Sequence, residues 1–448
     1  MKDFAQWEGF EGSRWKEQIN VRDFIRHNYT PYDGDDSFLE GPTEATDKLW
    51  GKLQELQKAE RANNGVLDME TKVVTGLTAY GPGYIAEDLK DLEKVVGLQT
   101  DKPLKRAFMP YGGIKMAEQA CEMYGYKVDP QIHDMFTKYE FKTHNQGVFD
   151  IYTPEMKRAR HSHILTGLPD TYGRGRIVGD YRRVALYGID ALIAGKEKDF
   201  ADSDRQGMRR YDFQLREEIA DQIRALKGMK EMAKVYGYDI SEPAKNAHEA
   251  FQWLYFGYLA AIKTQNGAAM SVGRISTFLD IYIERDLKNG VITEKEAQEL
   301  VDHMVMKFRM VKFARIESYN QLFSVTRYGQ LLRLQVLVLT DATWLPRMTI
   351  VSFILLRIWD RLRSQTLLFF ILPSCRKTSR NMLLIFLLQQ VLSSMRTMML
   401  CVRYGAMIIP SAAVYLQLRP VRKCSSLELV QTLRNASFMR STVVWMRS

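Results

Sequence analysis

Arginines separated by glycines form the most suggestive chemical pattern in the sequence. Arg174 and Arg176 lie in TYGRGRIVGDYRR (171–183), followed by Arg182 and Arg183, and the intervening glycines allow a ligand to approach the backbone closely. A guanidinium group binds a carboxylate through two parallel N–H bonds, so the pattern could hold an acidic substrate. On spacing alone, a structural cluster of ion pairs is favoured, with three acidic partners: Asp170, Asp180 and Glu217.

Three other patterns also allow a chemical and a structural interpretation. The small residues of NGAAMS (266–271) could line a substrate pocket or a tight contact between helices. His161 and His163 could share a metal on a strand, but no acidic or cysteine ligands stand at usable spacing, which favours surface histidines. A basic cluster beside them could bind phosphates or form a solvated helix face: Lys157, Arg158 and Arg160.

Cys121 is the cysteine of MAEQACEMYGY (116–126) and has neither a nearby histidine nor a CxxC motif. We therefore expect a buried structural thiol. The sequence has no P-loop, no strand-linked GxGxxG and no GxSxG turn. The residues alone thus indicate an anion-binding α/β protein and no particular reaction.

The elements that would position these residues are mainly helices within residues 1–324. An apolar repeat after Thr43 predicts a helix over 44–62, and another repeat predicts a helix near 215–226. Thr293 and Glu296 form a capping box that predicts a third helix. Its expected buried face comprises Ala297, Leu300, Val301, Met304 and Phe308. Glycine-rich connectors separate such helices, so residues 1–324 are interpreted as one helix-rich α/β unit.

The composition changes after Ser324. The whole chain has 448 residues, 46% of them hydrophobic, and a net charge of +10, which is typical of a globular protein. Residues 325–448 hold 17 Lys and Arg against three acidic residues, and only two of the 29 glycines. Their apolar runs are far shorter than the roughly 20 residues of a membrane span, and their arginines are scattered. We therefore expect neither a membrane nor a nucleic-acid partner. The four cysteines and the N-terminal sequence favour the cytoplasm.

Four long segments closely resemble the pyruvate formate-lyase family of glycyl-radical enzymes. They are VGLQTDKPLKRAFMPYGGIK (96–115), KTHNQGVFDIYTPEMKRAR (142–160), TGLPDTYGRGRIVGDYRRVALYGID (166–190) and AIKTQNGAAMSVGRISTFLDIYIERDL (261–287). The resemblance extends from about Trp7 to Ser324. It implies an α/β barrel of two half-sheets wrapped in helices, of which this region would supply the N-terminal half.

The resemblance also implies an activity and its residues. Pyruvate and CoA would be converted to acetyl-CoA and formate, through a protein glycyl radical and a thiyl radical on one of two adjacent cysteines. Arg176 would clamp the pyruvate carboxylate, Ala268 would line the same pocket, and Phe149 and Arg160 would lie where CoA approaches. An intact member would form a homodimer and be activated by a radical-SAM enzyme, and no metal ligands are expected in this chain.

The sequence departs from the family after Ser324. It contains no adjacent cysteines and no RVSGY radical segment, and Cys375, Cys401 and Cys424 each stand alone. Restoring one base after the Ser324 codon lets the codons of 325–331 spell GDPLWAT, which resembles the family. Read in the same restored frame, the codons of 410–416 can spell an adjacent cysteine pair. Those of 422–432 can spell KKMQFFGARAN, which also resembles the family. We therefore interpret 325–448 as an out-of-frame tail without a domain, disordered or poorly packed, and expect the chain to be inactive.

Two alternatives remain open. A truncated, non-catalytic subunit could pair with an intact homologue, which co-purification would reveal. The basic tail could instead bind membranes or nucleic acid, in which case binding would weaken with salt and disappear when 325–448 is deleted.

Overall fold

The computed structural model describes most of the first 314 residues and short strands beyond them. The described residues are 2–32, 38, 41–63, 65–72, 83–108, 114–137, 151–162, 179–203, 210–264, 271–273, 275–314 and strands β2–β9. The helices are α1 (Arg14–Glu17), α2 (Val21–Asn28), α3 (Glu44–Ala62), η1 (Glu87–Leu92), α4 (Ile114–Met123), α5 (Pro130–Thr137), α7 (Pro154–His161), α8 (Arg182–Ser203), α9 (Arg210–Val235), α10 (Ala247–Thr264), α11 (Ser276–Lys288) and α12 (Glu294–Met310).

The helix predictions are confirmed. α3 spans the predicted range 44–62, and the Thr43 side chain caps it by accepting a hydrogen bond from the Thr46 N–H. α12 begins with the predicted capping box, in which Thr293 and Glu296 satisfy each other's backbone N–H groups. The whole predicted face of α12 is buried. Local sequence patterns were sufficient here because caps and apolar spacing act within one or two turns.

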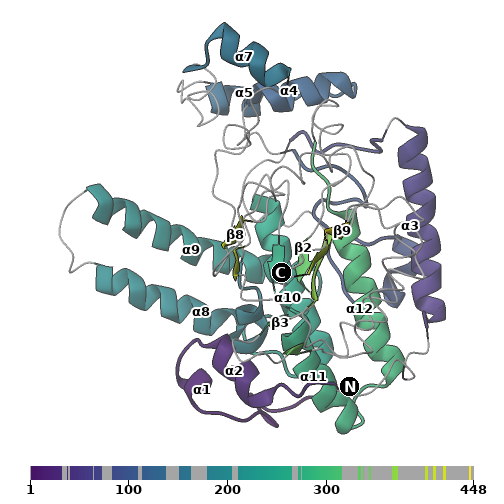
Figure 1. Ribbon diagram of the computed structural model, residues 1–448, viewed down its shortest axis with the longest axis vertical. Helices are drawn as coiled ribbons and strands as arrows, with labels where there is room; N and C mark the ends of the chain where they lie inside the picture. Colours follow the sequence, from purple (N-terminus) through teal and green to yellow (C-terminus); the bar gives the residue numbers. More distant parts are fainter. Residues whose placement is uncertain are drawn as a thin grey trace.

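α10 forms the centre of the core because apolar residues dominate its sequence. A helix with such a sequence must be buried, whereas an amphipathic helix can lie at a surface. Phe251, Leu254, Phe256 and Leu259 have no solvent exposure, and α8, α9, α11 and α12 all contact α10. Figure 1 shows α10 in the middle of the helices, with α3 and α12 to one side. Among the described helices, none has the length and apolarity that crossing a bilayer requires.

α8 and α9 form an antiparallel pair that projects from the body (Figure 1). Gly188 interrupts α8 with a φ of 72°, a conformation that side-chain-bearing residues rarely adopt. A Cβ at this position would clash with the Ser241 carbonyl oxygen. Hydrogen bonds on either side join Ile189 to Ile240 and Ala244 to Ala185. The kink therefore allows the first turns of α8 to pack against residues 240–244.

Cys121 lies in a second, smaller core around α4 and α5, apart from the main one. It is 1% exposed, and its Sγ lies 3.4 Å from Sδ of Met69. Burial, assisted by the charge of Glu118, raises the pKa of the thiol to about 11. The prediction that the Cys121 thiol is buried is confirmed.

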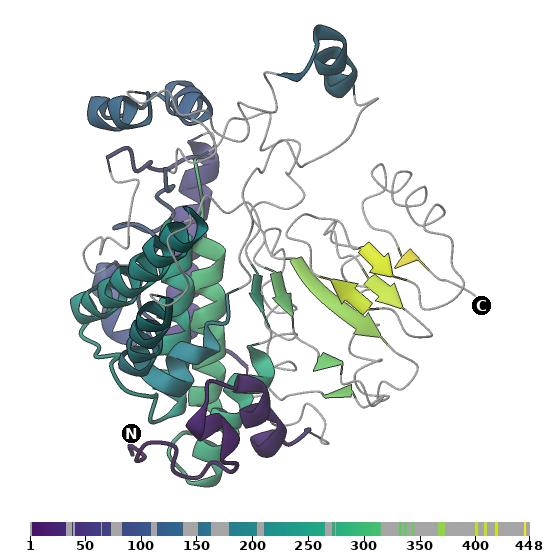
Figure 2. The same ribbon diagram turned by 90° about the vertical axis from the view of Figure 1, so that its left-hand side faces the viewer.

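The described strands lie on the opposite side of the molecule from most helices (Figure 2). They are β1 (Ser271–Gly273), β2 (Leu331–Arg333), β3 (Val336–Leu337), β4 (Thr343–Trp344), β5 (Thr366–Ile371), β6 (Met399–Cys401), β7 (Met407–Ile409), β8 (Gln417–Arg419) and β9 (Val443–Val444). Five of them form a sheet of order β1-β2-β5-β6-β9 with parallel pairings. β3 pairs with β4 and β7 with β8, both antiparallel. Apolar runs such as TLLFFI of β5 are typical of parallel strands.

Candidate substrate site

The substrate residues implied by the resemblance lie in segments attached to α8 and α10. Arg176 precedes α8, and Ala268 lies between α10 and β1; both positions, and Phe149, fall outside the described residues. Arg160 belongs to α7, of which the structure describes the backbone at that position but not the side chain. The described geometry therefore concerns the elements that carry these segments.

The start of α8 is packed against α10. The rings of Tyr181 and Tyr258 meet edge to face, with centroids 5.7 Å apart and an interplanar angle of 88°. Gly257 lies at this contact, where a Cβ would sit 3.5 Å from the Cβ of Tyr181. Arg176 is five residues before Tyr181, and Thr264 is six residues after Tyr258, about 9 Å of helix rise. Tyr181 and Thr264, described residues near these two segments, thus lie against and on the same helix, α10.

The described arginines after Arg176 form ion pairs. Asp180 Oδ1 lies 2.6 Å from Nε of Arg182, and its Oδ2 lies 3.7 Å from Nε of Arg183. These two arginines have the structural role that the alternative interpretation predicted. Asp170 and Arg174 lie outside the described residues, and Glu217 is exposed on α9.

The histidine and basic-cluster predictions fall on α7 and just beyond it. Lys157 and Arg158 are exposed, and Arg158 pairs with Glu155 at 2.8 Å, as expected of a solvated helix face. His161 ends the helix, so it does not lie on the strand that a metal pair would have required, and His163 lies outside the described residues. Within the part of the chain that the structure describes, no three His, Cys, Asp or Glu side chains gather to hold a metal.

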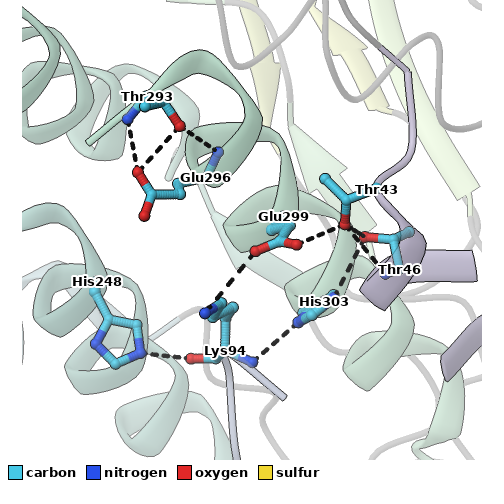
Figure 3. Close-up of polar contacts among 8 residues, drawn as sticks. All are labelled: Thr43, Thr46, Lys94, His248, Thr293, Glu296, Glu299 and His303. Carbon is cyan, nitrogen blue, oxygen red and sulfur yellow. Dashed lines mark hydrogen bonds and ion pairs between the residues drawn. The ribbon is translucent and has the colours of Figure 1, made fainter. Parts of the chain in front are cut away.

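A buried polar cluster joins α3 to α12 and to the segment after η1 (Figure 3). Nδ1 of His303 lies 3.0 Å from the Lys94 backbone N–H and accepts from it, and Nε2 lies 3.4 Å from the Thr46 hydroxyl. Acceptance at Nδ1 assigns the proton of the neutral ring to Nε2. Burial lowers the pKa of His303 to about 3. Thr43 donates to Glu299 at 2.5 Å. The ring therefore links three elements and carries no charge at neutral pH.

A buried ion pair lies deeper in the same region. Nζ of Lys307 contacts Oε2 of Glu93, and both side chains are at most 1% exposed. Oε1 of Glu93 also accepts from the Ile85 N–H at 2.5 Å. Charges removed from water are retained only when paired and hydrogen-bonded, so the pair holds the segment before Lys94 against α12.

The sequence analysis missed these buried polar residues. Their signal was available, since Lys307 interrupts the buried face of α12, and Gln252 and Lys263 interrupt the apolar α10. A polar residue inside an apolar run predicts a buried partner, although the sequence does not say which one.

The comparisons with known proteins agree on the family. The model of the family "Pyruvate formate lyase-like" matches residues 12–333. The chain is 60% identical over 322 residues to a formate acetyltransferase of Haemophilus influenzae, covering 71% of this chain and 41% of that protein. It is equally similar to formate acetyltransferase 1 of Escherichia coli, of which it covers 42%. The chain thus spans about two fifths of the length of these relatives.

Solved structures show the same fold at much lower identity. The B12-independent glycerol dehydratase from Clostridium butyricum matches with a TM-score of 0.57 and 16% identity, covering 80% of this chain and 50% of that one. A glycyl radical enzyme from Archaeoglobus fulgidus matches with a TM-score of 0.51 and 14% identity, covering 81% and 49%. The fold is therefore that of part of a glycyl radical enzyme. With the family model matching most of its length, this chain belongs to the pyruvate formate lyase-like family.

Proposed function

We propose that residues 1–324 are the N-terminal portion of a formate acetyltransferase, which converts pyruvate and CoA to acetyl-CoA and formate. The observation that carries this proposal is the 60% identity over 322 residues to relatives of that name. β1 would belong to the family's barrel, with Arg176 and Ala268 at its pyruvate pocket. Phe149 and Arg160 would lie where CoA approaches. Cytoplasmic location, homodimerisation and activation by a radical-SAM enzyme belong to the same proposal.

Arg176 would orient pyruvate through its planar guanidinium, which matches both carboxylate oxygens. Ala268 would leave room for the small methyl ketone, because a larger side chain in the same pocket would fill that space. Enclosure by helices would exclude water and dioxygen, which quench radicals. The contact between Tyr181 and Tyr258 supports this arrangement, since it brings the described start of α8 against α10, the helix after which Ala268 follows in the sequence.

We further propose that this chain binds pyruvate without turning it over. It has no adjacent cysteines and no RVSGY segment to carry the thiyl and glycyl radicals. Residues 325–448 would be the product of a lost base after the Ser324 codon. The coding DNA tests this directly: the alternative frame should spell GDPLWAT, then an adjacent cysteine pair, and then KKMQFFGARAN. A correctly read, uninterrupted gene ending at Ser448 would refute the lost base.

Pyruvate binding tests the function of the first 324 residues. Calorimetric titration of the purified chain should detect binding of pyruvate. Arg176→Lys should weaken this binding about 10- to 100-fold, because an ammonium group cannot form the bidentate pair with the carboxylate. The matched control is Arg183→Lys, which changes an exposed arginine near the start of α8. Equal affinities for both variants would contradict the assignment of Arg176. After incubation with the activating enzyme, the chain should show no glycyl-radical EPR doublet.

A further inference from the structure

α8 and α9 continue beyond the body of the protein as a two-helix arm. We define the arm as residues 190–203 of α8 and 212–235 of α9. Residues 184–189, the part of α8 that precedes the arm, are all buried, whereas most residues of the arm are exposed or half-buried. In Figure 1 the arm extends away from the other helices that the structure describes. The two helices of the arm therefore pack mainly against each other.

Two helices alone leave the apolar residues of the arm partly uncovered. Ile223 and Leu226, in the middle of α9, are only half-buried. Phe213, near the start of α9, is 54% exposed, and Val235, at its end, is 40% exposed. Four-helix bundles bury such residues around a common core. The arm thus has apolar surface that a further pair of helices would cover.

The charges of the arm are separated along α9. The first half of the helix holds three exposed acidic residues: Glu217, Glu218 and Asp221. The second half holds one acidic residue, Glu231, and four basic ones: Arg224, Lys227, Lys230 and Lys234. Each of these basic side chains has an acidic neighbour in the same chain, whereas among the described residues Glu217 and Glu218 form no ion pair. α9 therefore has an acidic half, with two carboxylates that lack a cation, and a basic half.

This separation of charge fits a second copy of α9 that runs in the opposite direction. A twofold axis near Arg224 would place the acidic half of each helix beside the basic half of the other, and the symmetry would repeat every contact. The position directly opposite Glu217 would be the partner subunit's Glu231. Its neighbours on the same helix face, three or four residues away, are the partner subunit's Lys227 and the partner subunit's Lys234. A parallel arrangement would instead place like charges side by side, which is unfavourable.

We propose that the arm is a self-association surface, and that its partner is a second copy of this chain packed antiparallel against it through α9. In the same register, Phe213 lies beside the partner subunit's Val235 at each end of the interface. The apolar residues supply affinity, and the charges specify the antiparallel orientation. This inference rests on the proposed function, since it names the surface of the homodimer included there.

Charge reversal on α9 tests the pairing, with sedimentation velocity of the full chain as the measurement. The unmodified chain should form a dimer as its concentration rises. One double variant, Glu217→Lys with Glu218→Lys, removes the acidic half, and a second, Lys227→Glu with Lys234→Glu, removes the basic half. Each should raise the dimer Kd at least about 10-fold, because facing charges then repel. Equimolar mixing of the two variants should restore a dimer, since their altered helices are complementary.

The matched control makes the same change of charge outside the arm. Glu55→Lys with Glu87→Lys alters exposed positions on α3 and η1 and should leave the dimer Kd unchanged. A monomeric unmodified chain would overturn the proposal. So would dimers that both α9 variants retain, or a mixture of the two variants that stays monomeric.

A carbodiimide, which joins a carboxylate to an amine without a spacer, provides a second readout. Glu217 and Lys227 are ten residues apart on one helix, about 15 Å, so a link between them found by mass spectrometry must join two chains. Pyruvate titration separates the arm from the proposed pocket. A chain that dimerises through α9 without binding pyruvate would refute the pocket alone, and a monomer that binds pyruvate would refute the arm alone.

Discussion

Asp302→Asn should stabilise the protein at neutral pH. Asp302 lies in α12 with no solvent exposure, and its Oδ1 accepts from the Gln298 side chain at 2.6 Å. Burial, together with the charges of Glu299 and Asp47, raises its pKa from 3.8 to about 8. At pH 7 the carboxyl is therefore protonated in the folded chain and ionised in the unfolded chain. Asparagine has nearly the shape of the neutral acid and does not titrate.

The magnitude follows from the linkage between protonation and folding. Because the folded pKa is raised, the stability that Asp302 provides is complete below pH 3.8 and is lost as the pH rises to about 8. Each pH unit in this interval costs about 1.4 kcal/mol, so about 4 kcal/mol is lost by pH 7. Asparagine does not reproduce the carboxylic O–H donor in full. We therefore expect Asp302→Asn to resemble the unmodified chain at pH 4 and to exceed its stability by about 2–4 kcal/mol at pH 7.

Urea unfolding followed by circular dichroism at pH 4 and pH 7 measures this difference. Asp199→Asn is the matched control, because this carboxylate on α8 is 54% exposed and paired with Lys196. Its effect should be below about 1 kcal/mol at both pH values. The free energies of unfolding of Asp302→Asn and the unmodified chain could also differ by the same amount at both pH values. That result would show that Asp302 is ionised in the folded chain at pH 7. The burial argument would then be wrong.

Three further substitutions test the described packing by the same unfolding assay. Lys307→Met should destabilise by about 3–5 kcal/mol because it leaves Glu93 buried without its cation; a loss below about 1 kcal/mol would show that the pair is hydrated. Gly188→Ala should cost at least about 2 kcal/mol, since the new Cβ would meet the Ser241 carbonyl; a neutral result would contradict the kink. Thr293→Ala should cost about 1 kcal/mol through loss of the capping box, and a Thr293→Ser control should retain most of the stability.

The fold could be predicted from the sequence wherever the signal was local. The apolar spacing after Thr43 and the Thr293–Glu296 box gave the bounds and the buried faces of α3 and α12. The resemblance identified the family that the comparisons show. The positions of Arg176 and Ala268 in a pocket stay predictions, because both lie outside the described residues.

The ionic interior could not be predicted in this way. Cys121 was correctly expected to be buried, because an isolated thiol in an apolar pattern has few alternatives. Lys307 and Glu93, by contrast, are 214 residues apart in the sequence and meet with almost no exposure. No spacing rule links such distant residues, and a charged residue in an apolar run states only that a partner must exist.

The sequence by itself determined the helices, the family and the change of composition after Ser324, because periodicity, capping and residue content are properties of the chain read in order. The tertiary structure decided which buried polar groups meet. Gln99, Lys263 and Lys312 come together only when α10, α12 and the segment between η1 and α4 are packed. The physical reason is that the free energy of a buried polar group depends on its partner and on its removal from water, and both are fixed only by the fold.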